Sequence, residues 1–146
     1  MEVVQAARDE KHISGHELRK VLFPDFFELH GDGLSGDDPA IVGGLATFHG
    51  QPVTVITTSR GHSLNERIEK HFGQPEPSGY RKACHLVENA AKFHRTVFLF
   101  VDTAGAYPGK SAEENGQGEA IAQNLLRIGQ AKTPIITIIY GEGGSG

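Results

Sequence analysis

The segments 96-TVFLFV-101 and 134-PIITIIY-140 decide the fold of this chain of 146 residues. Each segment is almost continuously apolar, which is typical of a strand that is covered on both faces. Between them, Ser111 to Ala131 is predicted to be mostly helical. The buried stripe of that helix is expected to comprise Ile121, Leu125 and Ile128. A strand, a helix and a strand at this spacing form a βαβ unit, so we predict two parallel, neighbouring strands with a right-handed crossover.

Each of these predicted strands runs into a glycine-rich loop, Thr103–Gly109 (TAGAYPG) and Gly141–Gly146 (GEGGSG). Parallel strands end at the same edge of a sheet, so we expect the two loops to approach each other there. Glycine lets backbone N–H groups come close to a ligand and point together, and such donors suit a phosphate or a developing oxyanion. One such loop favours a simple turn, but two at one edge favour a binding site.

Upstream of this unit the sequence predicts a helix over Ser14–His30, which opens with a capping box of Ser14 and Glu17. Pro24 is expected to kink this helix or divide it in two. A second amphipathic helix is predicted over Gly79–His94. Its apolar face is expected to include Cys84, and its polar face Arg81, Lys82, Glu88 and Lys92.

Two further strands are predicted upstream, over Ala40–Phe48 and Pro52–Thr58. Both are rich in β-branched and apolar residues. His49-Gly50 lies between them, which predicts a tight hairpin.

Composition excludes several function classes. The net charge is −4, from 14 basic and 18 acidic residues, whereas proteins whose main partner is a nucleic acid usually carry a strongly basic surface. No apolar run approaches the roughly 20 residues that cross a bilayer, and Met1–Lys11 lacks the apolar core of a signal peptide. Cys84 is the single cysteine, so no internal disulfide can form, and a reducing cytoplasm is expected.

Several strings of the sequence are similar to one enzyme family and occur in that family's order. They are Phe27–Asp32 (FELHGD), Gly79–Ala83 (GYRKA), Asp102–Gly109 (DTAGAYPG), Gly116–Ala122 (GQGEAIA) and Gly141–Gly146 (GEGGSG). From about Leu18 to its end, the chain resembles the alpha subunit of bacterial acetyl-CoA carboxylase carboxyltransferase. The resemblance implies an α/β, crotonase-like (ClpP/crotonase) superhelix of repeated ββα units, of which this chain would hold the N-terminal part only.

The resemblance also implies an activity. The family transfers a carboxyl group from carboxybiotin, on the biotin carboxyl carrier protein, to acetyl-CoA and forms malonyl-CoA, the first committed step of fatty acid synthesis. Expected partners are a carboxyltransferase beta subunit that carries zinc, with two copies of each subunit, and biotin carboxylase, in an ATP-binding cytoplasmic complex. No metal is expected in this chain itself.

By the same resemblance, Gly146 offers its backbone N–H to the oxyanion that forms on the ureido oxygen of biotin. The second glycine of the family's pair would follow it. The residues expected to line the substrate are Gly105, Ala106, Tyr107, Gly143, Gly144 and Ser145. The Tyr107 side chain either lines the biotin pocket or packs under its own loop.

The resemblance divides residues 1–146 into an N-terminal helical segment, 1–30, and a partial crotonase-like core, 40–146. The carboxyltransferase domain is then expected to be incomplete at its C-terminus, and the chain to be inactive alone. Two alternatives stay open. Ser145 would be the nucleophile of a serine hydrolase if Gly143-Gly144-Ser145-Gly146 began a nucleophile elbow. Alternatively, the chain is a degenerate paralogue that only binds the beta subunit.

Charged residues near the predicted loops have structural and functional interpretations. Asp102 is interpreted as a cap that accepts backbone N–H bonds, in preference to a substrate contact. Arg60, Arg81 and Lys82 either steer CoA phosphates or form a solvated surface. His12 and His16 lack an evident third ligand, so no zinc site is predicted there.

Overall fold

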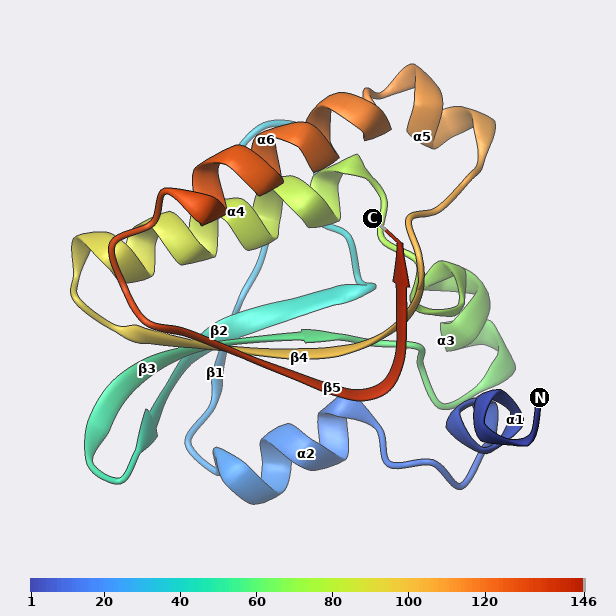
Figure 1. Cartoon of the computed structure of the whole chain (residues 1–146), viewed down its shortest axis with the longest axis horizontal. Helices are drawn as coiled ribbons and strands as arrows, with labels where there is room; N and C mark the ends of the chain where they lie inside the picture. Colours follow the sequence, from blue (N-terminus) through green and yellow to red (C-terminus); the bar gives the residue numbers. More distant parts are fainter. Residues whose placement is uncertain (146) are drawn as a thin grey trace.

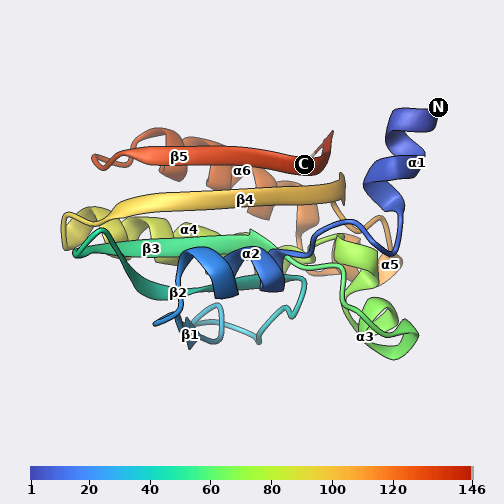
Figure 2. The ribbon, with the colours of Figure 1, turned by 90° about the horizontal axis from the view of Figure 1, so that it is seen from below.

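A mixed sheet with helices on both faces makes up the computed structural model, which describes residues 1–145 (Figure 1). Within those residues the elements are α1 (Glu2–Arg8), α2 (Gly15–Leu22), β1 (Phe27–Leu29), β2 (Ile41–Phe48), β3 (Gln51–Thr58), α3 (Leu64–Glu69), the 3-10 helix η1 (His71–Gly73), α4 (Pro77–Lys92), β4 (Thr96–Gly105), α5 (Lys110–Glu114), α6 (Gln117–Gly129) and β5 (Ile135–Ser145). The strands of the described residues form one sheet in the order β1-β2-β3-β4-β5 (Figure 2).

The strand pairings confirm the predicted topology. β4 and β5 are parallel neighbours, from Val97 opposite Ile135 onward, as the predicted βαβ unit requires. β3 and β4 are also parallel. β2 and β3 form the predicted antiparallel hairpin. Its two turn residues, His49 and Gly50, have φ of 49° and 75°, the positive values that a type I′ hairpin turn needs.

Two apolar clusters hold the layers together. α4 and α6 lie together over one face of the sheet and α2 lies on the other (Figure 1). On the helical side the buried cluster comprises Ile41, Ile56, Leu86, Val87, Ala90 and Val97. On the α2 side it comprises Phe23, Ala46, Val53, Val55 and Phe100. Cys84 is 1% exposed, so its predicted place in the core is confirmed.

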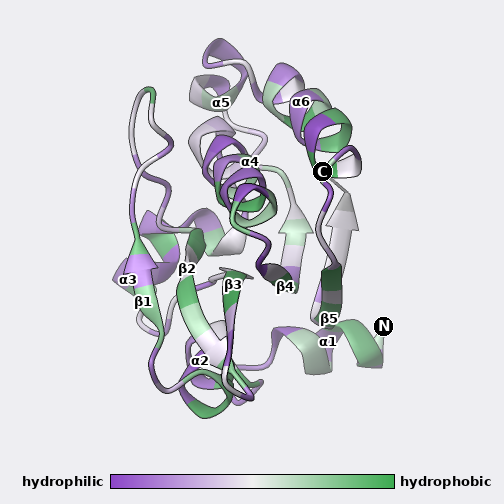
Figure 3. Ribbon diagram, turned by 90° about the vertical axis from the view of Figure 1, so that its left-hand side faces the viewer, coloured by the Kyte–Doolittle hydropathy of each residue, from purple (hydrophilic) through white to green (hydrophobic). Residues whose placement is uncertain are grey.

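The predicted burial of β5 on both faces is wrong for the described residues. Ile136, Ile138 and Ile139 are 44%, 40% and 61% exposed. The hydrophobic stretch of β5 lies in the strand at the edge of the sheet (Figure 3). Leu125, assigned to a buried stripe, is 75% exposed. The cause is that α6 packs against α4, which leaves the outer side of β5 uncovered within residues 1–145.

The predicted helix over Ser14–His30 is also wrong beyond Leu22. The capping box of Ser14 and Glu17 is present, but Phe23 leaves the helical region with φ −134° and ψ 72°. A residue that precedes proline is disfavoured in the α conformation, so Pro24 ends the helix instead of kinking it. The chain then forms the short strand β1, which pairs with β2.

Two other helix predictions need correction. The helix predicted over Ser111–Ala131 is divided into α5 and α6 at Gly116, whose φ is 82°. Lys82, assigned to the polar face of its helix, is 1% exposed. Its ammonium lies 2.6 Å from Asp37 and donates to the carbonyl of Ile41, which satisfies the buried charge. No helix within the described part of the chain is long and apolar enough to span a bilayer.

Candidate active site

The two glycine-rich segments meet at one edge of the sheet, as predicted. Both segments begin as strand, because β4 continues to Gly105 and β5 continues to Ser145. Of the predicted loops, only residues 106–109 have no regular secondary structure among the described residues. Thr103 lies opposite Gly143, and Gly105 lies opposite Ser145. A Cβ on Gly144 would lie 2.1 Å from the carbonyl oxygen of Ala104, so the two backbones approach more closely than any side chain allows. Gly146, the predicted oxyanion donor, lies outside the described residues.

A large bulge interrupts the pairing just before this contact. Val101 lies opposite Ile139 and the next pair is Thr103 opposite Gly143. Asp102 alone therefore faces three residues of β5, from Tyr140 to Glu142. Bulges re-aim a strand and are common beside active sites.

The Asp102 side chain occupies the centre of the bulge. Its Oδ1 accepts the backbone N–H of Glu142 at 2.9 Å, which confirms the predicted capping role. The residue is 5% exposed. A Cβ on Gly141 would lie 2.3 Å from the same oxygen, so only glycine fits at this position beside the carboxylate.

A network of charges surrounds Asp102. Arg60, from the loop after β3, donates Nε and Nη2 to the two Asp102 oxygens at 3.0 and 2.9 Å. The same Nη2 also donates to Glu142 at 2.7 Å. Arg60 is thus committed to two carboxylates, unlike the freely solvated or phosphate-steering residue that its sequence position suggested. Arg81 and Lys82 are likewise ion-paired, with Asp32 and Asp37.

Glu142 links this network to α1. Arg8 donates Nε to the Glu142 carboxylate at 3.1 Å and forms an ion pair with it. Hydrogen bonds from Arg8, and then from Arg60, lower the pKa of Glu142 to about 2. The carboxylate therefore stays ionised across the physiological range.

The loop after β4 rests on the segment around η1. Tyr107 donates its backbone N–H to the carbonyl of Pro75 at 3.0 Å, and its ring stacks on His71 with 3.7 Å between centroids. The amide nitrogen of buried Gln117 donates to the carbonyls of Pro75 and Tyr107 at 2.9 and 3.0 Å. Of the two interpretations of Tyr107, this arrangement favours packing under its own loop.

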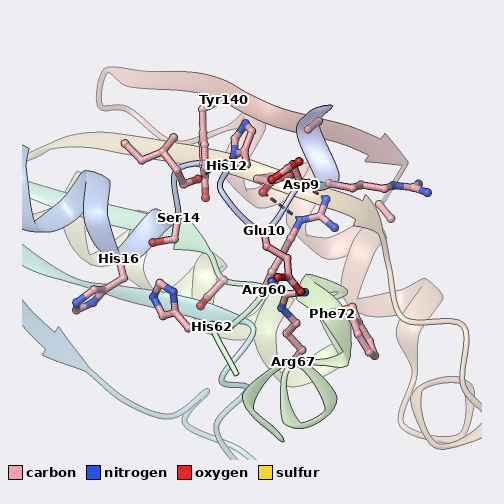
Figure 4. Close-up of a pocket in the computed structure, with 18 of the residues that line it drawn as sticks. Asp9, Glu10, His12, Ser14, His16, Arg60, His62, Arg67, Phe72 and Tyr140 are labelled. Carbon is pink, nitrogen blue, oxygen red and sulfur yellow. Dashed lines mark hydrogen bonds and ion pairs between the residues drawn. The ribbon is translucent and has the colours of Figure 1, made fainter. Parts of the chain in front are cut away.

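A cleft of about 590 Å³ opens beside the network, between α1 with the segment that follows it and the loop after β3 (Figure 4). Asp102, Ala104 and Tyr140 line it from the sheet. Burial, and then the charge of Asp102, raise the pKa of Tyr140 to about 12, so its phenol stays neutral. Figure 4 shows that polar side chains line most of the remaining wall, among them His12, Ser14, His16, Arg60, His62 and Arg67.

The cleft contains residues that sequence reasoning missed. Residues 7–16 were assigned to a separate helical segment, yet they form one wall, and no local pattern announced this contact. Conversely, Gly105, Ala106, Tyr107, Gly143 and Gly144 belong to the sheet edge and its loop and do not line the cleft. Within residues 1–145, no group of three or more His, Cys, Asp or Glu side chains is placed to hold a metal ion.

The backbone around Ser145 disfavours the hydrolase alternative. A nucleophile elbow holds its serine on a sharp turn between a strand and a helix. Ser145 instead belongs to the strand β5 and lies opposite Gly105.

The chain is similar to one family of known proteins along its whole length. The family model described as acetyl co-enzyme A carboxylase carboxyltransferase-like matches residues 1–146. The chain is 56% identical, over 99% of its length, to the acetyl-coenzyme A carboxylase carboxyl transferase subunit alpha of Shouchella clausii, and covers 45% of that relative. It is 54% identical, over 99% of its length, to the protein of that name from Streptococcus pyogenes and covers 56% of it. The chain spans about half the length of the curated relatives it matches.

Solved structures share the fold at low sequence identity. The transcarboxylase 12S core, solved with methylmalonyl-coenzyme A and methylmalonic acid bound, superposes with a TM-score of 0.73 and 21% identity over 90% of this chain and 24% of that one. The beta subunit of geranyl-CoA carboxylase from P. aeruginosa gives a TM-score of 0.69 and 15% identity over 88% of this chain and 22% of that one. These likenesses confirm the predicted crotonase-like α/β fold. The match of the family model along the whole chain shows that the chain belongs to the acetyl-coenzyme A carboxylase carboxyltransferase family.

Proposed function

We propose that this chain supplies the alpha-subunit side of a carboxyltransferase site, which moves a carboxyl group from carboxybiotin to acetyl-CoA and yields malonyl-CoA. The observation that carries the proposal is its 54–56% identity, over nearly its whole length, to relatives named as carboxyl transferase alpha subunits. The C-terminal ends of β4 and β5, residues 103–105 and 141–145, form what we call the glycine edge. This part of the fold is proposed to face the reaction.

The edge has the chemistry that such a reaction needs. Carboxybiotin supplies the carboxyl group, and negative charge develops on an oxygen during transfer. Backbone N–H groups that are already in place stabilise such charge without side-chain nucleophiles. Within the described residues no strand pairs with the outer side of β5, so N–H groups on that side have no strand partner. Gly143 and Gly144 are exposed and carry no side chain, which lets a planar ligand approach the backbone.

Residue roles follow from this arrangement. The oxyanion donor is proposed to be the N–H of Gly146. Gly105, Ala106, Gly143, Gly144 and Ser145 are proposed to line the substrate. Tyr107 is proposed to support this edge, because its ring stacks on His71. The proposed partners are a beta subunit that holds zinc and acetyl-CoA, the biotin carboxyl carrier protein and biotin carboxylase, in the cytoplasm.

The test uses the chain with a purified beta subunit, carboxylated biotin carrier and acetyl-CoA, and measures malonyl-CoA. The full-length relative from Shouchella clausii is assayed in parallel. We expect the chain either to support turnover or, added in excess, to inhibit the full-length relative by competing for the beta subunit. Inhibition without turnover shows that the chain binds the beta subunit without being active alone, as both an incomplete domain and a degenerate paralogue predict. The absence of both turnover and inhibition would refute the proposal.

A further control addresses the hydrolase. Ser145→Ala removes the hydroxyl that an acyl-enzyme needs but leaves the backbone unchanged. Under the proposed function this variant keeps the effect of the chain on malonyl-CoA formation. Hydrolysis of a p-nitrophenyl ester by the parent chain that disappears in Ser145→Ala would establish the hydrolase instead.

A further inference from the structure

We infer that Arg60 and Asp102 are positioning residues that fix the bulge of β5 and thereby aim the backbone of Gly143 and Gly144. The inference rests on the proposed function for its consequence in catalysis. Its structural part stands without that function and is tested separately below.

The first step is the geometry of the bulge. Three residues of β5, from Tyr140 to Glu142, lie opposite the single residue Asp102 of β4. Such an excursion leaves backbone groups without ladder partners, and these need hydrogen bonds from elsewhere. The Glu142 N–H finds its acceptor in Asp102 Oδ1 at 2.9 Å. The carboxylate thus replaces a ladder partner at the point where β5 turns back toward β4.

The second step is that the carboxylate cannot shift. Thr58 Oγ1 accepts the backbone N–H of Asp102 at 2.7 Å and donates to its carbonyl at 3.0 Å. Arg60 holds both carboxylate oxygens with its planar fork, which fixes their orientation as well as their charge. The Asp102 side chain is 6% exposed, so water is a poor substitute for any of these partners.

The third step connects this unit to the cleft. Arg60 also binds Glu142, whose carboxylate binds Arg8 at the end of α1. None of the residues of α1, all of which the structure describes, is buried. The position of α1 at the mouth of the cleft therefore depends on the side chain of Glu142. Asp102 fixes the backbone N–H of that same residue. One chain of contacts joins the wall of the cleft to the glycine edge.

The experiment measures hydrogen–deuterium exchange of single amides by NMR in the parent chain and in Asp102→Asn. The variant keeps the size of the side chain and one acceptor oxygen, but loses the charge that strengthens its hydrogen bonds with Arg60 and the Glu142 N–H. We expect exchange at Glu142 to accelerate by roughly ten-fold, as the change from a charge-assisted to a neutral hydrogen bond implies. The amide of Val55, in the centre of the sheet, serves as the internal reference and is expected to change far less.

Two further variants separate positioning from general destabilisation. Arg60→Gln leaves Asp102 in place, so Glu142 exchange is expected to rise less than in Asp102→Asn, and Arg60→Lys is expected to recover part of that loss. Glu114→Gln is the matched control, because it breaks the Lys110–Glu114 pair, whose side chains are 89% and 64% exposed. Equal acceleration at Glu142 and Val55, or no acceleration at Glu142 in a folded variant, would overturn the inference.

The catalytic consequence is read in the assembled system used for the proposed function. Where the chain supports turnover, Asp102→Asn is expected to lower kcat at least ten-fold and to leave KM for acetyl-CoA unchanged, since the beta subunit is proposed to bind acetyl-CoA. A ten-fold rise in KM with kcat unchanged would refute this consequence. If the chain neither supports turnover nor inhibits the full-length relative, the proposed function fails, while the exchange result still decides whether Arg60 and Asp102 hold the bulge.

Discussion

Replacing Gly144 by alanine tests whether the glycine edge is held as tightly as the structure shows. The added Cβ would lie 2.1 Å from the carbonyl oxygen of Ala104 and 2.2 Å from its carbonyl carbon. The obstacle is backbone, so no side-chain rotation relieves it. β4 and β5 must separate by roughly 1 Å to restore ordinary packing.

The magnitude combines two costs. Overpacking of this kind destabilises proteins by about 1–3 kcal/mol. Separation of the strands also weakens the hydrogen bonds around Thr103 and Gly105, each worth about 0.5–1.5 kcal/mol. We therefore expect Gly144→Ala to lower the free energy of unfolding by about 2–4 kcal/mol.

Gly118→Ala is the matched control, because it makes the same chemical change in α6 where a Cβ would meet nothing within 4 Å. There, alanine should stabilise the chain by up to about 1 kcal/mol through its higher helix propensity. The assay is urea unfolding followed by circular dichroism. With slopes of about 1–3 kcal/mol per molar urea, the two midpoints should differ by about 1 M or more. Equal midpoints for both variants would show that the strands do not meet at Gly144.

Three other predictions concern the core and the charge network. Phe23→Ala should cost about 3–5 kcal/mol of stability in urea unfolding, because Phe23 is 1% exposed, whereas Phe93→Ala, at a site 57% exposed, should cost far less. Arg8→Ala should raise the pKa of Glu142 from about 2 toward its ordinary value of 4.5, as followed by NMR titration. Because that folded-state pKa is depressed, the stability it contributes is complete above about pH 4.5 and is lost as pH falls through about 2, so the variant should lose less stability than the parent chain in that window. Burial raises the pKa of Cys84 to about 11, so a disulfide reagent should modify it only as fast as the chain unfolds.

Apolar runs in the sequence predicted the sheet but not its borders. TVFLFV and PIITIIY both form strands, and their parallel pairing followed from the helix between them. The burial of PIITIIY on both faces was not confirmed. A continuous apolar run indicates that a strand is covered, but it does not indicate which element covers it. α6 packs on α4, so Ile139 is left 61% exposed within the described chain. Pro24 was predicted to kink the helix or divide it in two, but the helix ends before it, because Phe23 has already left the helical conformation.

The meeting of the two glycine segments was predictable from the sequence, but the contacts that hold them in place were not. Strand direction placed both glycine segments at one edge, and the composition of Thr103–Gly109 and Gly141–Gly146 marked them. The Asp102 carboxylate accepts hydrogen bonds from both Arg60, 42 positions earlier, and the backbone of Glu142. No spacing in the sequence indicates this shared contact. Such a contact depends on the bulge, and the bulge depends on a register that sequence periodicity does not specify.

The glycines themselves were a correct signal for an incorrect reason. They were expected to form loops, but Gly141 and Gly144 lie in a strand and are required by what they face. Gly141 passes a carboxylate and Gly144 passes a carbonyl, each at a distance that excludes a Cβ. A segment that must run close to two oxygen acceptors keeps its own N–H groups ordered and its surface free of side chains. Those are the properties that a preorganised oxyanion site needs, so the steric demands of the bulge and the chemical demands of the proposed reaction favour the same residue.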